Sequence, residues 1–127
     1  MGYYITQGDT EIKIKAEHHI AIIEKIKEFV RQGNHLDWTD DNTILNATDL
    51  GTIFDEIGWE LEYNNGDVIG IEFVLEKLGS EDVFFHLIAE FVEDNSYITI
   101  LGEGAESWRY AFNDGKMRIL QGRYVYE

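Results

Sequence analysis

Residues 59–73 read WELEYNNGDVIGIEF, a pattern that predicts a β-hairpin. Apolar and acidic side chains alternate along residues 59–63, as in a strand that buries one face and exposes the other to water. A second run rich in β-branched residues, 68–73, follows after turn-forming residues. The two runs are therefore expected to pair as antiparallel strands, in a register set by the length of the loop between them.

The length of the loop in this hairpin can be predicted from the side chains that each length would place opposite one another. A two-residue Asn65-Gly66 turn sets Glu62 opposite Ile69, which places an acidic and an apolar side chain on one face. A three-residue loop, Asn64-Asn65-Gly66, instead sets Leu61 opposite Ile69 and keeps the apolar side chains together. We therefore predict the three-residue loop, with its glycine in the left-handed conformation of a bulge turn.

The other elements follow from hydrophobic periodicity and from residues that end helices or form turns. Apolar residues at helical spacing predict three helices, at residues 16–32, 50–57 and 81–91. Residues typical of strands predict four strands in addition to the two of the hairpin, at residues 3–6, 97–101, 107–112 and 117–126. Asp114-Gly115 fits a two-residue turn between the last two strands. The chain, residues 1–127, is thus expected to form a single α+β domain with the order β-α-α-β-β-α-β-β-β.

Short connections between strands require a mainly antiparallel sheet, which we expect to have five or six strands. The three helices are amphipathic and should cover one face of it. The side chains expected on the core side of the sheet are Trp59, Leu61, Ile69, Ile71, Ile98, Ile100, Trp108, Tyr110 and Ile119. The apolar stripe of the first helix runs through Ile20, Ile23, Ile26 and Val30, and the later helices should add Phe54 and Leu87.

The net charge of -15 is concentrated in the middle of the chain. Residues 32–108 hold eighteen acidic residues and a single basic one, Lys77, for a charge of -17. The segment before them is neutral, and residues 109–127 carry +2. Such a field repels nucleic acids and anionic membranes, so a protein with a basic surface is the expected partner. Solubility alone is the alternative reason for the acidic residues.

Composition also narrows the class of protein. The chain contains no cysteine, which excludes disulfides and thiolate chemistry. We expect neither a signal peptide nor a membrane-spanning segment, because no basic region precedes an apolar run and no apolar run approaches about 20 residues. A cytoplasmic location is therefore expected, with no contact to a membrane.

No motif predicts an enzyme, a cofactor or a metal site. The adjacent His18 and His19 point about 100° apart on a helix and lack metal-ligand spacing. The oxygen-rich segment 37–43, DWTDDNT, lacks the alternate ligands, central glycine and final glutamate of a calcium loop. Gly102-Glu103-Gly104 lacks the third glycine and the helix of a dinucleotide-binding motif. The few cations near the C-terminus are too sparse to predict direct nucleic-acid binding.

Several segments carry a resemblance to known proteins. They are residues 1–5 (MGYYI), 58–60 (GWE), 66–73 (GDVIGIEF), 77–79 (KLG), 108–112 (WRYAF) and 114–116 (DGK). Together they resemble a family of small acidic proteins found in Gram-positive bacteria and in their phages and mobile elements. The resemblance spans most of the chain, with residues 10–47 least matched. It implies that genomic setting and assigns no functional residue.

Two functions remain open from the sequence. The first is a non-enzymatic protein-binding module of a phage or mobile element, in its sharpest form a DNA mimic that inhibits a nucleic-acid-binding enzyme, as anti-restriction and anti-CRISPR proteins do. The second is a structural, immunity or assembly protein with an ordinary acidic surface. The residues expected to bind the partner, with Trp38 as an aromatic anchor, are Asp37, Trp38, Asp40, Asp41, Glu60 and Glu62.

Overall fold

The computed structural model describes residues 5–37, 39–75, 79–102 and 106–122. The strands are β1 (Ile5–Glu11), β2 (Trp59–Asn64), β3 (Asp67–Phe73), β4 (Ser96–Gly102), β5 (Ser107–Asn113) and β6 (Lys116–Gly122). The helices are α1 (His19–Arg31), α2 (Asp41–Leu45), α3 (Leu50–Ile57) and α4 (Glu81–Ile88), with 3-10 turns η1 (Ala16–His18) and η2 (Ala89–Phe91). The predicted α+β class and order of elements are confirmed, with α2 as an additional helix.

The six strands form two antiparallel sheets rather than one. Four strands pair in the order β1-β4-β5-β6, and β2 pairs with β3 alone. The side chain of Gln7 on β1 spans the gap between the sheets: its Nε2 donates to the Ile71 carbonyl at 2.9 Å, and its Oε1 accepts from the Phe73 N–H at 2.8 Å. A side-chain amide therefore takes the place of a backbone ladder between β1 and β3.

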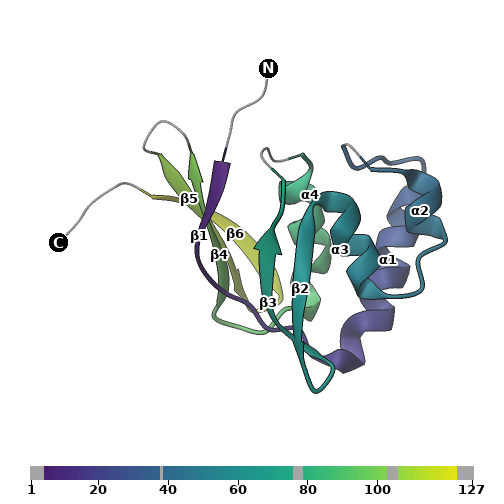
Figure 1. The fold of residues 1–127 in the computed structure, drawn as a ribbon, viewed down its shortest axis with the longest axis horizontal. Helices are drawn as coiled ribbons and strands as arrows, with labels where there is room; N and C mark the ends of the chain where they lie inside the picture. The colour runs from purple at the N-terminus through teal and green to yellow at the C-terminus, as the bar shows by residue number, and fades with distance from the viewer. Residues whose placement is uncertain (1–4, 38, 76–78, 103–105, 123–127) are drawn as a thin grey trace.

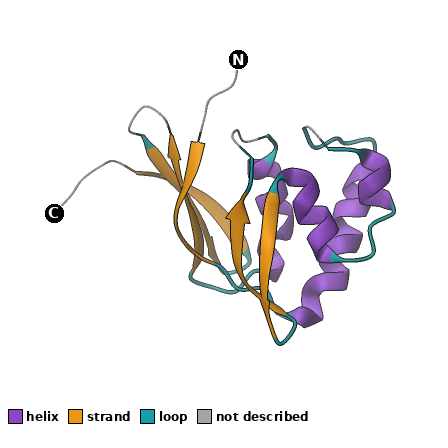
Figure 2. Cartoon of the chain, in the orientation of Figure 1, coloured by secondary structure: helices purple, strands orange, loops and turns teal. Residues whose placement is uncertain are grey.

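The helices lie on one side of the four-stranded sheet, as predicted, and the opposite face of that sheet has no helix over it (Figure 1). Figure 2 shows the same separation between helices and strands. None of the helices among the described residues is long and apolar enough to cross a membrane. The core lies between the helices and the two sheets, where the Phe85 ring contacts Trp59, Phe84, Tyr110 and Phe112.

The predicted hairpin loop is wrong. Asn65 and Gly66 alone form the turn, with positive φ angles of 53° and 87°. The register then shifts by one residue between Glu62 and Tyr63, so that Leu61 pairs with Ile71 instead of Ile69. This bulge absorbs the mismatch that a regular two-residue hairpin would create. It leaves Ile69 46% exposed, against our expectation of a buried side chain.

The alternation of faces along β2 is confirmed from Trp59, which is fully buried, to Glu62, which is exposed. It fails at Tyr63, which lies beyond the bulge and is 50% exposed. The last hairpin also has the predicted register: Asp114-Gly115 forms its turn, and Tyr110 pairs with Ile119. Of the other residues predicted to face the core, Ile71, Ile98, Ile100 and Tyr110 are buried, and Leu61 and Trp108 are half-buried.

Besides Ile69, two further side chains predicted in the core are exposed. Ile119 is 40% exposed because it lies on β6, the last strand of its sheet. Ile20 is 76% exposed at the start of α1, where Ile22 is buried in its place. The predicted first strand, residues 3–6, begins within the described residues at Ile5 and continues to Glu11. Its polar second half faces open solvent on one side, so it lacks the apolar signal of a strand.

Candidate functional site

Five carboxylates gather on one surface, formed by the start of α2, by α3 and by β2. We call this surface the acidic face; its carboxylates are those of Asp40, Asp49, Asp55, Glu56 and Glu60. All but Asp40 line a shallow groove of about 470 Å³ between α3 and β2, which Thr43 and Tyr63 also line. Glu56 is half-buried and the other four are exposed. The groove is therefore open to water and strongly anionic.

Helix caps fix two of these carboxylates. Asp40 Oδ1 accepts from the Asn42 N–H at 3.0 Å at the start of α2, and its Oδ2 accepts from the Thr43 hydroxyl at 3.2 Å. Asp49 Oδ1 accepts from the N–H and the hydroxyl of Thr52, at 2.8 and 3.0 Å, at the start of α3. Each aspartate thus satisfies a backbone N–H that the helix leaves free, and its charge stays at a defined place.

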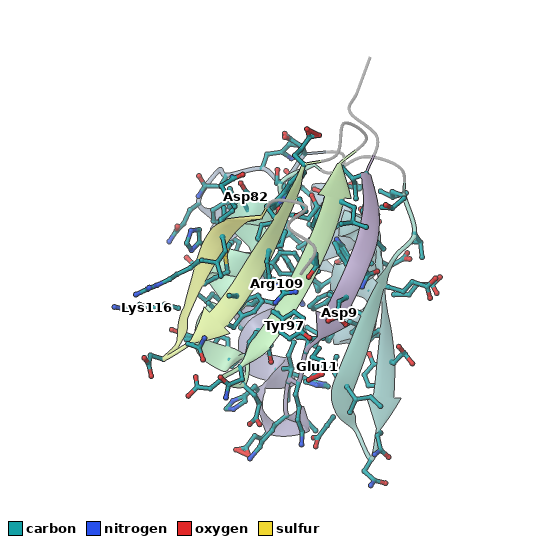
Figure 3. All side chains as sticks on the ribbon, turned by 90° about the vertical axis from the view of Figure 1, so that its left-hand side faces the viewer. Asp9, Glu11, Asp82, Tyr97, Arg109 and Lys116 are labelled. Carbon is teal, nitrogen blue, oxygen red and sulfur yellow. The ribbon has the colours of Figure 1, made fainter. Side chains whose placement is uncertain are left out.

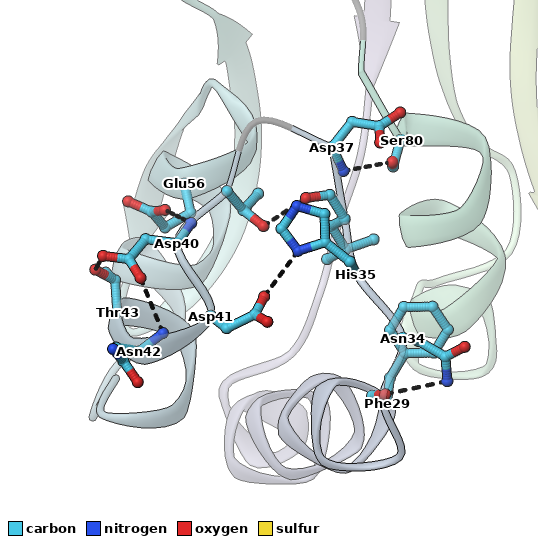
Figure 4. A network of polar contacts seen from close by, with 12 residues as sticks. Phe29, Asn34, His35, Asp37, Asp40, Asp41, Asn42, Thr43, Glu56 and Ser80 are labelled. Carbon is cyan, nitrogen blue, oxygen red and sulfur yellow. Dashed lines mark hydrogen bonds and ion pairs between the residues drawn. The ribbon is translucent and has the colours of Figure 1, made fainter.

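Further hydrogen bonds join the elements of the acidic face (Figure 4). The Asp40 N–H donates to Glu56 Oε1 at 2.9 Å, which ties the start of α2 to α3. Next to it, His35 Nδ1 lies 2.9 Å from Asp41 Oδ1, with both side chains about half exposed. Gly58 ends α3 in the left-handed conformation, with φ of 98°, and reverses the chain so that β2 runs back beside the helix. Glu60 thereby lines the same groove as Glu56.

The residues predicted to bind the partner are only partly brought together. Asp40 and Glu60 belong to the acidic face, and Asp41 lies beside it. Asp37 lies elsewhere, where its N–H donates to the Ser80 hydroxyl at 2.8 Å next to α4. Glu62 lies further along β2 over Gly70, where an added Cβ would come within 2.7 Å of its Oε1. Trp38, the predicted anchor, lies outside the described residues.

The acidic face has no cation to neutralise it among the described residues. The ion pairs that the described lysines and arginines form lie elsewhere, as Lys15–Glu93, Lys25–Glu90, Arg31–Glu24 and Arg31–Glu28. Partial burial, and then the negative charge of Asp49, raise the pKa of the Tyr63 hydroxyl at one end of the groove. Tyr63 therefore stays a neutral hydrogen-bond donor beside the carboxylates.

A pair of like charges extends the field onto the hairpin. Glu60 on β2 lies directly opposite Glu72 on β3, and both side chains are exposed. Like charges in such cross-strand positions destabilise a hairpin by a few tenths of a kcal/mol, up to about 1 kcal/mol. The hairpin thus retains acidic residues at a cost in stability, which solubility alone does not require.

We expect Glu72→Gln to raise the free energy of unfolding by about 0.5 kcal/mol, because it removes one charge of this repelling pair. Urea denaturation at low ionic strength measures the gain, which should shrink as salt screens the charges. Glu11→Gln is the matched control, since Glu11 pairs with the uncharged Tyr97. An equal gain in the control, or a gain unaffected by salt, would contradict the repulsion.

Three residues of the acidic face were missed by sequence reasoning: Asp49, Asp55 and Glu56. The cap at Asp49 is recognisable, because an aspartate precedes the apolar stripe of α3. The other two follow from Gly58, since a helix that ends in such a reversal places its last turn beside the next strand. The oxygen-rich segment 37–43 looked more distinctive, yet part of it serves to cap α2.

The described residues show no group of three or more His, Asp or Glu side chains that could hold a metal ion. The histidines make other contacts: the His18 ring lies 5.7 Å from the Phe91 ring, and the His19 ring lies 6.3 Å from Tyr63. The acidic face offers carboxylate oxygens, which can accept hydrogen bonds from cationic groups. Comparison of the chain with protein-family models, with curated proteins and with solved structures gives no match.

Proposed function

We propose that this protein is a non-enzymatic binding module whose acidic face binds a basic surface of a partner protein. One observation carries the proposal: five carboxylates from three elements share one surface, and no described lysine or arginine pairs with them. Carboxylates already held by caps lose little freedom on binding, which favours affinity. A cationic partner would also be attracted from a distance and bind rapidly at low salt.

In its sharper form, the proposal is that the acidic face imitates the charge of DNA. DNA presents phosphates in fixed positions along its axis, and proteins that bind it neutralise them with lysine and arginine. Carboxylates held on a helix and a strand offer the same kind of target. An inhibitor of a nucleic-acid-binding enzyme in a phage or mobile element would work in this way, without itself binding nucleic acid.

The experiment immobilises the wild type and two variants. Each variant replaces five carboxylates by amides, which changes the net charge from -15 to about -10. The test variant is Asp40→Asn, Asp49→Asn, Asp55→Asn, Glu56→Gln and Glu60→Gln. The control variant is Glu11→Gln, Glu17→Gln, Glu24→Gln, Asp94→Asn and Asp114→Asn. Asparagine still caps a helix, so the test variant should remain folded.

From a lysate of a Gram-positive bacterium, we expect the wild type and the control variant to retain a DNA-binding protein that the test variant loses. Added duplex DNA should release that protein, and its affinity should fall about tenfold or more between about 50 and 200 mM salt. Retention of the same proteins by all three baits would contradict the proposal. Release by salt but not by DNA would contradict only its DNA-mimic form.

A further inference from the structure

The outer edge of β6 is free among the described residues. The four-stranded sheet ends at β6, which pairs only with β5. Asn113 and Lys116 close the two-residue turn, and hydrogen-bonded and non-bonded pairs alternate from there along an antiparallel hairpin. The backbone N–H and C=O groups of Met117, Ile119 and Gln121 therefore face away from β5. Such groups are a template for one more strand.

A groove of about 520 Å³ lies beside this edge, between α4 and the inner face of β5 and β6. Its apolar lining includes Val83 from α4 and Ile119 from β6, both partly exposed, together with the half-buried Trp108. Side chains from alternate residues of an added strand would point to this side of the sheet, next to Ile119. The groove thus offers a place for those side chains.

Two carboxylates, those of Asp37 and Asp82, make the groove anionic. The buried Tyr110 hydroxyl donates to Asp82 Oδ1 at 2.6 Å. Burial, and then the bond to Asp82, raise the pKa of Tyr110 far above its ordinary value, so this hydroxyl remains a donor. The bond orients Asp82 and leaves its Oδ2 without a hydrogen bond to the described residues. Asp37 likewise keeps its carboxylate free of such bonds.

The other side of β6 has the opposite charge. Lys116 and Arg118 alternate with the groove-side residues and lie toward the open face of the sheet. Figure 3 shows that face, with Lys116 at one side, Arg109 and Tyr97 near the middle, and Asp9 and Glu11 at the other side. A strand added to β6 would therefore meet acidic residues on its groove side and basic residues on its open side.

We propose that β6 binds an extended segment of a partner protein as an added antiparallel or parallel strand, with lysine or arginine at the alternate positions that face the groove. The stem of such a side chain can pack on Val83 and Ile119 while its charge meets Asp82, and the Trp108 indole offers a cation–π contact. Acidic or neutral residues suit the other positions, beside Lys116 and Arg118. Two copies of this chain, each with a net charge of -15, would instead repel one another.

The groove is separate from the acidic face, so this proposal does not rest on the proposed function. The probe is a synthetic peptide in which lysine occupies every second position, with threonine or glutamate between. Titrated into the 15N-labelled protein, it should shift the amide signals of Met117, Ile119 and Gln121. A peptide of the same composition in shuffled order should bind at least about tenfold more weakly. Two further peptides are N-methylated on alternate residues, one along each edge. Only the one whose methyl groups face β6 should lose affinity to a similar extent, because the other keeps the N–H groups that bond to β6.

Two matched variants locate the site. Asp82→Asn keeps an acceptor for Tyr110 but removes the charge, and should weaken the peptide about tenfold. Glu17→Gln removes the same charge outside both the groove and the acidic face, and should leave the peptide affinity unchanged. The proposal is overturned if the peptide does not bind the wild type, if both N-methylated peptides bind as well as the parent, or if Asp82→Asn has no effect. If the acidic face were found to bind no partner, the expected results for this peptide would not change.

Discussion

Replacement of Trp59 by alanine is expected to lower the free energy of unfolding by about 4 kcal/mol. Trp59 is fully buried, and its ring centroid lies 5.0 Å from that of Phe73 and 5.7 Å from that of Phe85. The substitution leaves a large cavity where the hairpin packs on α4, and cavities of this kind account for losses of about 3–5 kcal/mol. It also deprives the buried Glu81 of the indole N–H, which donates to its Oε2 at 3.1 Å.

Trp59→Phe separates these two effects. Phenylalanine fills most of the space but donates no hydrogen bond, so the loss should be about 2 kcal/mol. Urea denaturation followed by far-ultraviolet circular dichroism measures both variants without relying on tryptophan fluorescence. A loss below about 1 kcal/mol for Trp59→Ala would mean that the hairpin contributes little to the core, contrary to the packing described above.

The local elements of the fold could be predicted from the sequence where one periodicity decides them. The apolar stripe of α3 and the alternation along β2 each depend on residues close together in the chain. The length of the hairpin loop is not decided by periodicity alone. A bulge allows a two-residue turn while still keeping apolar and acidic side chains on opposite faces. The division into two sheets likewise depends on distant residues, because the Gln7 side chain links β1 to β3 where no backbone ladder joins the two strands. No local pattern reveals such a contact.

The negative charge of the candidate site could be predicted from the sequence, but its location could not. The block of acidic residues shows that the middle of the chain is anionic, and Glu60 lies on the exposed face of β2 as its alternation predicts. The grouping of Glu60 with Glu56 and Asp49 depends on how α3 and β2 pack together, which is a tertiary property. Asp37 was separated from the others because Ser80, far away in the sequence, binds its N–H.

Glu81 is the one charged side chain that the described part of the core buries, with 1% of its surface exposed. Its Oε1 accepts from the Gly79 N–H at 2.6 Å, and its Oε2 accepts from the Trp59 indole. We expect Glu81→Ala to lower the free energy of unfolding by about 3 kcal/mol, because two buried donors lose their acceptor. Urea denaturation at about pH 5 measures the loss, and a change below about 1 kcal/mol would show that water replaces the carboxyl group.

The charge of Glu81 should also appear as a pH dependence of stability. Burial raises the pKa of this carboxyl above its ordinary value of about 4.5, and this effect outweighs its hydrogen bonds to Trp59 and Gly79. The folded protein therefore binds the Glu81 proton more tightly than the unfolded chain. Its contribution to stability is complete below pH of about 4.5 and is lost as the pH rises through the pKa of the folded state.

Glu81→Gln cannot titrate and loses one of the two hydrogen bonds, because its amide nitrogen faces a donor. The variant should be less stable than the wild type in acid, and the difference should narrow as the pH rises from 4 to 8 in a series of urea denaturation curves. A difference that stays constant or widens over this range would show that the buried carboxyl is not held in its protonated form by the fold.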